Sequence, residues 1–210
     1  AIVGYTNAGK STLLNALTGA GVLEEDQLFA TLDPTTRVLD LPGKQQILLT
    51  DTVGFIRKLP HHLIEAFKST LEEAKYADII LHVVDASNPR KETHMHVVYD
   101  TLKQLGVENK KGITLFNKQD LCLDKEQLRD FQADHVLNIS ARTGEGLEKV
   151  KEILEQTLRE DQVYIERLYP YEQAGKISVI RKHGQVLQEE YLPEGISVKA
   201  YIPMENYHTV

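Results

Sequence analysis

The chain has 210 residues, of which 41% are hydrophobic, and it carries a formal net charge of −7. This length is enough for one α/β domain and a small annex. The acidic balance excludes a general electrostatic attraction to nucleic acid, and no apolar run approaches the ~20 residues of a membrane helix. Cys122 is the only cysteine, so an intrachain disulfide is impossible and a cytoplasmic location is favoured.

Strand and helix patterns alternate along most of the chain, which predicts an α/β fold with a mostly parallel sheet and helices on both faces. In chain order we expect the strand Ala1–Val3, the helix Lys10–Thr18, a hairpin of Arg37–Leu41 and Gln46–Thr50, the helix His61–Tyr76, the strand Asp78–Val84, the helix Glu92–Leu105, the strand Ile113–Phe116, a short helix Lys125–Phe131, the strand Val136–Ile139 and the helix Gly146–Glu160.

The pattern changes after residue 162, where we expect the boundary between a first domain, 1–162, and a small α+β domain, 163–210. In the second part we expect a helix over Glu172–Lys182 and two strands, Val186–Leu192 and Ile196–Ile202. A segment of this size is too small to bury much core by itself.

The strongest motif is Gly4-Tyr5-Thr6-Asn7-Ala8-Gly9-Lys10-Ser11, which matches the phosphate-binding pattern G-x-x-x-x-G-K-[ST]. Successive backbone N–H groups and a helix N-terminus surround phosphates in such a loop. Lys10 supplies a cation for the phosphate oxygens, and the Ser11 hydroxyl supplies a ligand for Mg²⁺. Only three residues precede Gly4, fewer than the usual ~5 of a strand, so we expect further chain upstream.

Asp51-Thr52-Val53-Gly54 follows the predicted strand that ends at Thr50. An acid at this place can hold Mg²⁺ through water, and the Gly54 N–H can sense a γ-phosphate. The pattern D-x-x-G is common, so its weight comes from its order after the phosphate loop.

Two further motifs predict a base-binding site for guanine. The Asp120 carboxylate of Asn117-Lys118-Gln119-Asp120 can accept two hydrogen bonds from guanine, whereas adenine would leave it unsatisfied. Lys118 has an aliphatic stem that can lie over the base. The backbone of Ser140-Ala141-Arg142, after the next predicted strand, can contact the guanine carbonyl. Together the motifs predict a P-loop NTPase, a Ras-like G domain that binds and hydrolyses GTP.

The segment between the first two motifs is the candidate switch, because a threonine there should reach Mg²⁺ only while the γ-phosphate is present. Three threonines compete for this role, Thr31, Thr35 and Thr36.

The phosphate loop, the switch segment Phe-Ala-Thr-Leu-Asp-Pro-Thr and the run Asp-Thr-Val-Gly-Phe-Ile together resemble the HflX family of translation GTPases, relatives of the Obg group. The resemblance covers at least residues 1–160, and residues 163–210 look like the C-terminal domain of that family. By analogy with the family's Phe-x-Thr-Leu-x-Pro element we choose Thr31 for Mg²⁺, with Thr36 as the alternative.

The resemblance implies a further N-terminal domain that is not in this chain, and binding to the large ribosomal subunit with a role in splitting or rescuing ribosomes. We expect a monomer that uses Mg²⁺. The expected catalytic residues are Lys10, Thr31 and Gly54, and the expected metal ligands are Ser11, Thr31 and, through water, Asp51. The expected nucleotide contacts are Gly4, Tyr5, Thr6, Asn7, Ala8, Gly9, Lys10, Ser11, Thr12, Phe29, Ala30, Thr31, Leu32, Asp33, Asp51, Thr52, Val53, Gly54, Asn117, Lys118, Asp120, Ser140, Ala141 and Arg142.

Several alternatives stay open at this level. Phe55 stands where Ras-like enzymes place a water-orienting glutamine, so we expect slow hydrolysis without a partner. Asn7 is either an ordinary loop residue or a residue that helps to hold K⁺ as an activator. The chain is either a hydrolysing switch, or a GTP-dependent binding module or Obg-like assembly factor with negligible hydrolysis. An ATPase is disfavoured by Asp120.

Overall fold

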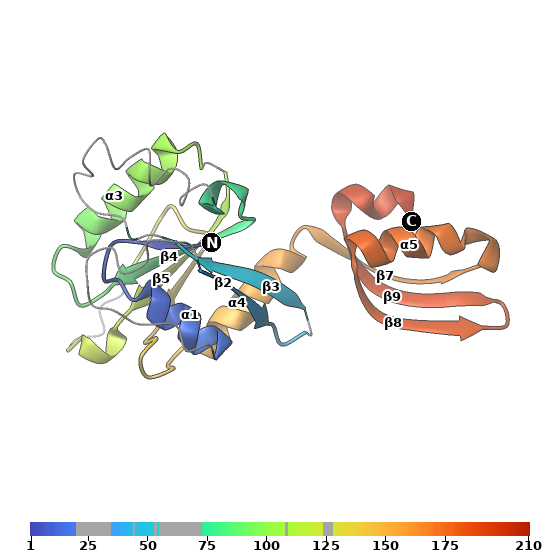
Figure 1. Cartoon of the computed structure of the whole chain (residues 1–210), viewed down its shortest axis with the longest axis horizontal. Coiled ribbons are helices and arrows are strands. Elements are labelled where there is room, and N and C mark those ends of the chain that lie inside the picture. Colours follow the sequence, from blue (N-terminus) through green and yellow to red (C-terminus); the bar gives the residue numbers. More distant parts are fainter. Residues whose placement is uncertain (20–34, 44, 53, 55–72, 108, 124–127) are drawn as a thin grey trace. The chain divides into compact units, whose positions relative to one another are not determined.

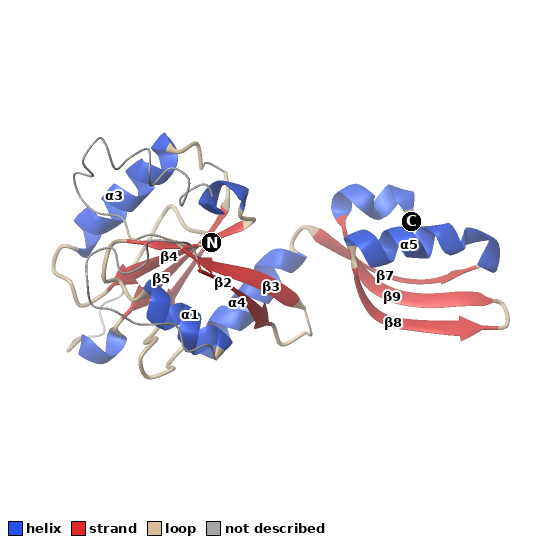
Figure 2. Ribbon diagram, in the orientation of Figure 1, coloured by secondary structure: helices blue, strands red, loops and turns tan. Residues whose placement is uncertain are grey.

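The computed structural model describes the chain apart from residues 20–34, 44, 53, 55–72, 108 and 124–127 (Figure 1). The chain forms two compact units, Ala1–Lys151 and Glu152–Val210. Figure 2 shows that helices and strands are mixed in both units. Among the described residues, no helix is both long and apolar enough to cross a membrane.

The first unit is built on a sheet whose six described strands lie in the order β2-β3-β1-β4-β5-β6. β2 and β3 pair antiparallel, and each of the other neighbouring pairs is parallel. The strands are β1 Ile2–Gly4, β2 Thr35–Asp40, β3 Gln46–Asp51, β4 Ile79–Asp85, β5 Lys111–Asn117 and β6 His135–Asn138. The predicted mostly parallel α/β sheet is therefore confirmed.

Helices lie on both faces of this sheet (Figure 1). On one face α3 (Lys91–Gln104) packs through Val98 and Leu102 against Val3 and Ile80 of the sheet. On the other face lies α1 (Lys10–Thr18), whose Leu13, Leu14 and Leu17 are buried. The central strands are continuous apolar runs because helices cover them from both sides.

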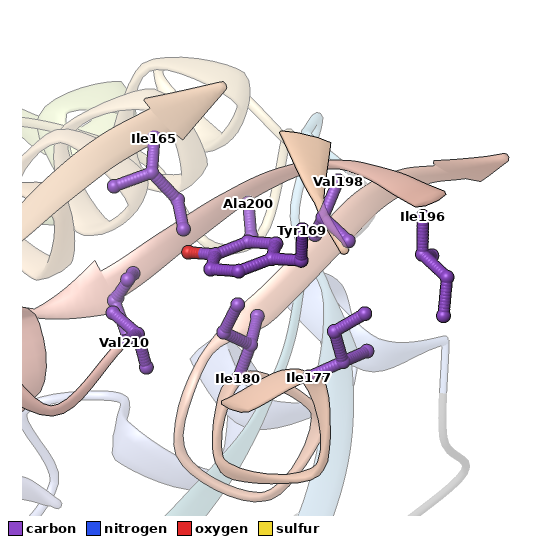
Figure 3. Packing of buried hydrophobic residues seen from close by; sticks show 9 residues of the cluster. Ile165, Tyr169, Ile177, Ile180, Ile196, Val198, Ala200 and Val210 are labelled. Carbon is purple, nitrogen blue, oxygen red and sulfur yellow. The ribbon is translucent and has the colours of Figure 1, made fainter. Parts of the chain in front are cut away.

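The second unit is a three-stranded antiparallel sheet with one helix against it. β7 (Gln162–Tyr169), β9 (Gly195–Pro203) and β8 (Gln185–Leu192) lie in that order. Figure 3 shows the Tyr169 ring lying among residues of the sheet and Ile177 and Ile180 of α5 (Ala174–His183). This is a separate apolar core. α4 (Leu147–Arg159) begins in the first unit and ends in the second.

Most predicted elements occur within a few residues of their expected bounds, with two corrections. β7 was not predicted as a strand. The predicted short helix Lys125–Phe131 is wrong for residues 128–131, which are not helical; residues 125–127 lie outside the described part of the chain. Of the predicted helix His61–Tyr76, residues 73–76 are described and helical. The expected domain boundary at 162/163 falls at the start of β7 and stays a prediction.

One polar side chain is buried in the middle of the first sheet. His82 of β4 is 3% exposed, and its Nδ1 has no hydrogen-bond partner among the described residues. It lines a cavity of about 470 Å³ beside α3, where its ring and the Tyr99 ring form a T-shaped pair with centroids 5.0 Å apart. Burial lowers the pKa of His82 from 6.5 to about 4, against the opposing effect of Asp130.

The pKa of His82 predicts a loss of stability in mild acid. Between pH 6.5 and about 4 the unfolded chain binds a proton at this imidazole that the folded chain does not. The free energy of unfolding should therefore fall as the pH falls through this window, by up to about 3 kcal/mol from this group. Urea unfolding at stepwise pH, compared between the parent and His82→Leu, measures it; parallel curves for the two proteins would contradict the prediction.

The core of the second unit predicts a large effect for one truncation. Ile180 is fully buried between α5 and the sheet, so Ile180→Ala should lower the free energy of unfolding of this unit by about 2–5 kcal/mol. Leu187 of β8 is 47% exposed, and Leu187→Ala is a control that should cost about 1 kcal/mol or less. Urea unfolding followed by circular dichroism compares them. Equal losses would show that the assigned core is wrong.

Candidate functional site

The predicted phosphate loop connects β1 to α1, and its two motif glycines are required by close contacts. A Cβ atom on Gly4 would lie 2.4 Å from the Val83 carbonyl oxygen. A Cβ on Gly9 would lie 2.3 Å from Nδ2 of Asn117, and Gly9 also has a φ of +96°, a value that side-chain-bearing residues rarely adopt. The loop therefore keeps its path only with glycine at these positions.

Lys10 and Gly54 meet beside this loop. The Lys10 side chain is 7% exposed, and burial lowers its pKa although the nearby Asp51 opposes the shift. A Cβ on Gly54 would lie 3.0 Å from Nζ of Lys10 and 2.9 Å from Cγ2 of Thr6. The fold thus brings together the lysine of the first motif and the glycine of the second, and the buried Lys10 ammonium lies next to Gly54.

Ser11 and Asp51 also meet, which joins the first motif to the second. The Ser11 hydroxyl donates a hydrogen bond of 2.6 Å to Oδ2 of Asp51, the last residue of β3. The next residue, Thr52, is fully buried and donates from its hydroxyl to the Ile2 carbonyl at 2.7 Å. A hydroxyl and a carboxylate at one point form the oxygen-rich pair that Mg²⁺ prefers.

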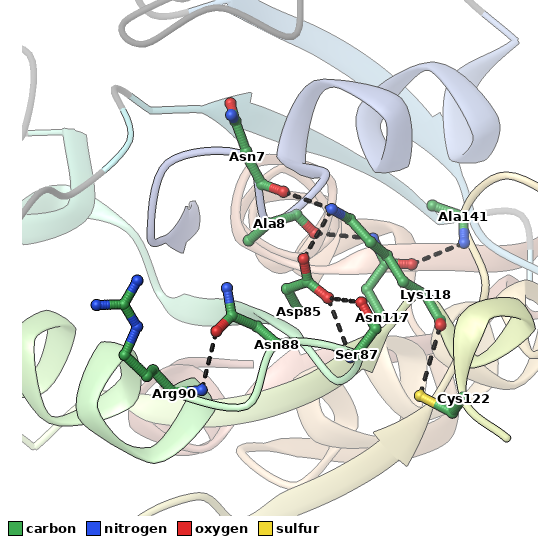
Figure 4. Close-up of polar contacts among 10 residues, drawn as sticks. All are labelled: Asn7, Ala8, Asp85, Ser87, Asn88, Arg90, Asn117, Lys118, Cys122 and Ala141. Carbon is green, nitrogen blue, oxygen red and sulfur yellow. Dashed lines mark hydrogen bonds and ion pairs between the residues drawn. The ribbon is translucent and has the colours of Figure 1, made fainter. Parts of the chain in front are cut away.

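Asn117 connects the phosphate loop to the fourth motif, as Figure 4 shows. Its amide nitrogen donates to the Ala8 carbonyl at 2.9 Å, and its amide oxygen accepts from the Ala141 N–H at 2.9 Å. Asn117 is 2% exposed, so both hydrogen bonds are shielded from water. One side chain therefore fixes the distance between two loops that the sequence separates by more than a hundred residues.

Lys118 adds a second link to the phosphate loop. Its ammonium donates to the Asn7 carbonyl and to Oδ2 of Asp85, both at 2.8 Å (Figure 4). Asp85 is the last residue of β4. Lys118 itself has a φ of +66°, a left-handed conformation that is uncommon for residues other than glycine.

Asp120, the predicted guanine-reading residue, lies beside Ser140 of the fourth motif. The Ser140 hydroxyl donates to Oδ1 of Asp120 at 2.7 Å and accepts from the Thr143 N–H at 3.2 Å. Arg142 is exposed on the same loop. The third and fourth motifs therefore form one polar surface, connected through Asn117 to the phosphate loop.

Other predicted site residues lie outside the described part of the chain. Phe29–Asp33, including the chosen threonine Thr31, and Val53 are among them, so their expected roles stay predictions. Thr35 and Thr36 are described and belong to β2, where the Thr36 hydroxyl is 2.8 Å from that of Thr50. Thr12 lies in the first turn of α1.

Two contacts of this site were not predicted from the sequence. Asp85 was not singled out, although an acid that ends a buried apolar strand is a recognisable signal. The Tyr5 ring of the phosphate loop stacks on His94 of α3 with centroids 3.7 Å apart, and burial lowers the pKa of His94. No group of residues suited to hold a metal through histidine, cysteine or clustered acids occurs among the described residues.

The chain is similar to known proteins over nearly its whole length and over its motifs. Residues 1–118 match the family described as 50S ribosome-binding GTPase. The chain is 67% identical over 205 residues to a GTPase HflX of Lacrimispora saccharolytica, covering 98% of this chain and 48% of that protein. It is 48% identical over 205 residues to a GTPase HflX of Caldanaerobacter subterraneus, covering 98% and 47%. The chain thus spans about half the length of these curated relatives.

Solved structures agree with the fold. A GTP-binding protein from Sulfolobus solfataricus in complex with GDP matches with a TM-score of 0.61 and 31% identity, over 74% of this chain and 50% of that chain. A single-residue variant of Aquifex aeolicus Era bound to GDP·AlF₄⁻ matches with a TM-score of 0.57 and 31% identity, over 73% and 55%. The described site, the matching family and the curated relatives agree, and the chain belongs to the 50S ribosome-binding GTPases and, among them, to the HflX family.

Proposed function

We propose that this chain binds GTP and hydrolyses it to GDP and phosphate, as the G domain of a switch protein that associates with the large ribosomal subunit. One observation carries the proposal: four motifs far apart in the sequence meet at one place. The Asn117 amide and the Lys118 ammonium join the phosphate loop to the third and fourth motifs, and the Ser11–Asp51 hydrogen bond joins it to the second. The two parts of this switch are residues 1–162 as the G domain and 163–210 as a small C-terminal domain.

The phosphate end is formed by the loop Gly4–Ser11. Backbone N–H groups of the loop and the start of α1 bind the phosphates, as is general for a helix N-terminus. The Lys10 ammonium neutralises phosphate charge as it develops during transfer. Gly54 packs against Lys10 and Thr6, so its N–H is well placed to sense the γ-phosphate. These residues bind and orient the nucleotide.

Mg²⁺ fits the oxygen pair of Ser11 and Asp51, whose side chains are 2.6 Å apart beside Lys10. Thr31 is the proposed third residue and lies outside the described part of the chain. When bound, the cation supplies positive charge that offsets the charge of the phosphates. The hypothesis that K⁺ acts at Asn7 stays a prediction, tested by comparing hydrolysis rates in KCl and NaCl.

The base end is formed by Asn117–Asp120 and Ser140–Arg142. Asp120 accepts hydrogen bonds from the two neighbouring N–H donors of guanine, and the backbone of the Ser140–Arg142 loop, which Asn117 holds at Ala141, contacts the guanine carbonyl. The stem of Lys118 lies along the base. Adenine cannot make the pair of hydrogen bonds with Asp120, which supports GTP rather than ATP as the ligand.

The base assignment predicts a change of specificity in Asp120→Asn. An amide in place of the carboxylate removes one acceptor for guanine and adds a donor that suits xanthine, which carries a carbonyl where guanine has its amine. Affinity for GDP should fall by about 10- to 100-fold and affinity for xanthosine diphosphate should rise. Calorimetry with both diphosphates measures this.

The control is thermal unfolding, which should change little, because asparagine keeps an oxygen acceptor for the Ser140 hydroxyl. Unchanged preference for guanine in a folded Asp120→Asn variant would exclude Asp120 as the base-reading residue. In that case the proposed function as a GTP-specific protein would lose its main support.

The ribosomal part of the proposal predicts a partner-dependent rate. Without large subunits, single-turnover hydrolysis should proceed at a rate near or below the ~10⁻⁴–10⁻² s⁻¹ of unassisted GTPases, because Phe55 cannot orient water by hydrogen bonding. Large subunits should raise this rate, and a non-hydrolysable GTP analogue should favour co-sedimentation with them over GDP. Measurements on this chain and on a chain of the relatives' full length compare the contributions of the two halves.

Two results would change the proposal. A rate above ~1 s⁻¹ without ribosomes would exclude the slow intrinsic hydrolase. Nucleotide-dependent binding to large subunits with no phosphate release would favour the alternative, a GTP-dependent binding module or an Obg-like assembly factor.

A further inference from the structure

The ammonium group of Lys118 is held from two sides by elements that are distant in sequence. One hydrogen bond goes to the Asn7 carbonyl in the phosphate loop and the other to Oδ2 of Asp85 at the end of β4, each 2.8 Å long. The Lys118 side chain is 30% exposed and that of Asp85 18%. At this partial burial the ion pair is less screened by water and salt than a surface pair would be.

The Asp85 carboxylate is itself fixed by the turn that follows β4. Its Oδ1 accepts hydrogen bonds from the N–H of Ser87 at 3.0 Å and from the Ser87 hydroxyl at 2.6 Å. Its backbone carbonyl accepts from the N–H of Asn88 at 3.2 Å. One oxygen of the carboxylate therefore serves the turn, and the other is directed at Lys118, as Figure 4 shows.

The oxygen directed at Lys118 matters because a lysine side chain has many rotamers, and restricting the side chain to one rotamer on ligand binding costs free energy. Here the ammonium is already ordered by a fixed carboxylate, so the stem of Lys118 is in place before a base packs on it. The same ammonium holds the Asn7 carbonyl, which orders the phosphate loop as well. A residue that touches neither base nor phosphate can thus control both ends of the site.

We propose that Asp85 is a positioning residue of the nucleotide site, which acts through the Lys118 ammonium to order the base platform and the phosphate loop together. The inference rests on the proposed function as a guanine-nucleotide-binding protein and deepens it. A purely structural role is the competing explanation, in which Asp85 serves only the turn through Ser87.

Asp85→Asn separates these explanations, because asparagine keeps an oxygen for Ser87 and loses the charge that faces Lys118. The rate at which a fluorescent GDP analogue dissociates should rise about tenfold, the lower part of the range for loss of one partner of a charged hydrogen bond. The dissociation rate of a fluorescent GTP analogue should rise by a similar factor, because GDP and GTP carry the same base and Lys118 packs against the base. Thermal unfolding of the nucleotide-free protein should change little.

A double-mutant cycle tests whether Asp85 acts through Lys118. In a Lys118→Ala background, Asp85→Asn should change the dissociation rate less than twofold, because the group that Asp85 holds is absent. Fully additive effects of the two substitutions, or an Asp85→Asn variant with the parent's dissociation rate, would overturn the proposal.

Two further variants serve as controls. Ser87→Ala removes a hydrogen bond from the turn but leaves the ion pair, so it should affect dissociation clearly less than Asp85→Asn; an equal effect would assign the role to the turn and overturn the proposal. Glu148→Gln removes one carboxylate charge and an ion pair of 2.9 Å with Lys151, and it should leave dissociation unchanged. If the parent itself shows no preference for guanine nucleotides, the proposed function fails, and this outcome is distinct from a parent-like Asp85→Asn.

Discussion

The hydrogen bonds of the Asn117 amide are the interaction on which the rest of the site depends. The planar amide holds a donor nitrogen and an acceptor oxygen in fixed directions. The nitrogen donates to the Ala8 carbonyl, and the oxygen accepts from the Ala141 N–H. Both partners are backbone groups of loops, and both hydrogen bonds are buried with Asn117 at 2% exposure. Removing the amide would leave buried polar groups unsatisfied in two loops at once, which is expensive. The same amide explains why residue 9 must be a glycine, because a Cβ atom at Gly9 would collide with it.

The parallel sheet explains why these loops meet. β1, β3, β4 and β5 run in the same direction, so the residues that follow them reach one edge of the sheet. Crevices at the carboxyl ends of strands are the general position of ligand sites in such folds. Asp51, Asp85 and Asn117 each end a strand on that edge. The strand ends thus supply the fixed polar groups, and the loops supply backbone groups that the strand ends hold in place.

How far the sequence predicts this molecule depends on the range of each interaction. The phosphate loop and the buried strands were predictable because glycines, the lysine-serine pair and apolar runs act locally. The contacts of Lys118 with Asp85 and of Tyr5 with His94 were not, because they join segments whose proximity only the folded sheet creates. β7 escaped prediction because Arg167 interrupts its apolar face; the structure places its guanidinium on the Val210 carbonyl and over the Tyr207 ring. A strand is therefore difficult to predict when a charged residue occupies its apolar face and only tertiary contacts satisfy that charge.

Lys10 shows how such an assembly prepares for an anion. Burying an ammonium disfavours its charged form, and the lowered pKa of Lys10 expresses this cost, which Asp51 only partly offsets. The folded sheet, the phosphate loop and Gly54 nevertheless hold the group in one place. Under the proposed function, a phosphate oxygen binds here to a cation that has already lost most of its water, so the attraction is stronger than in solvent. The free energy that folding loses by burying Lys10 is therefore available again as affinity for a negatively charged ligand.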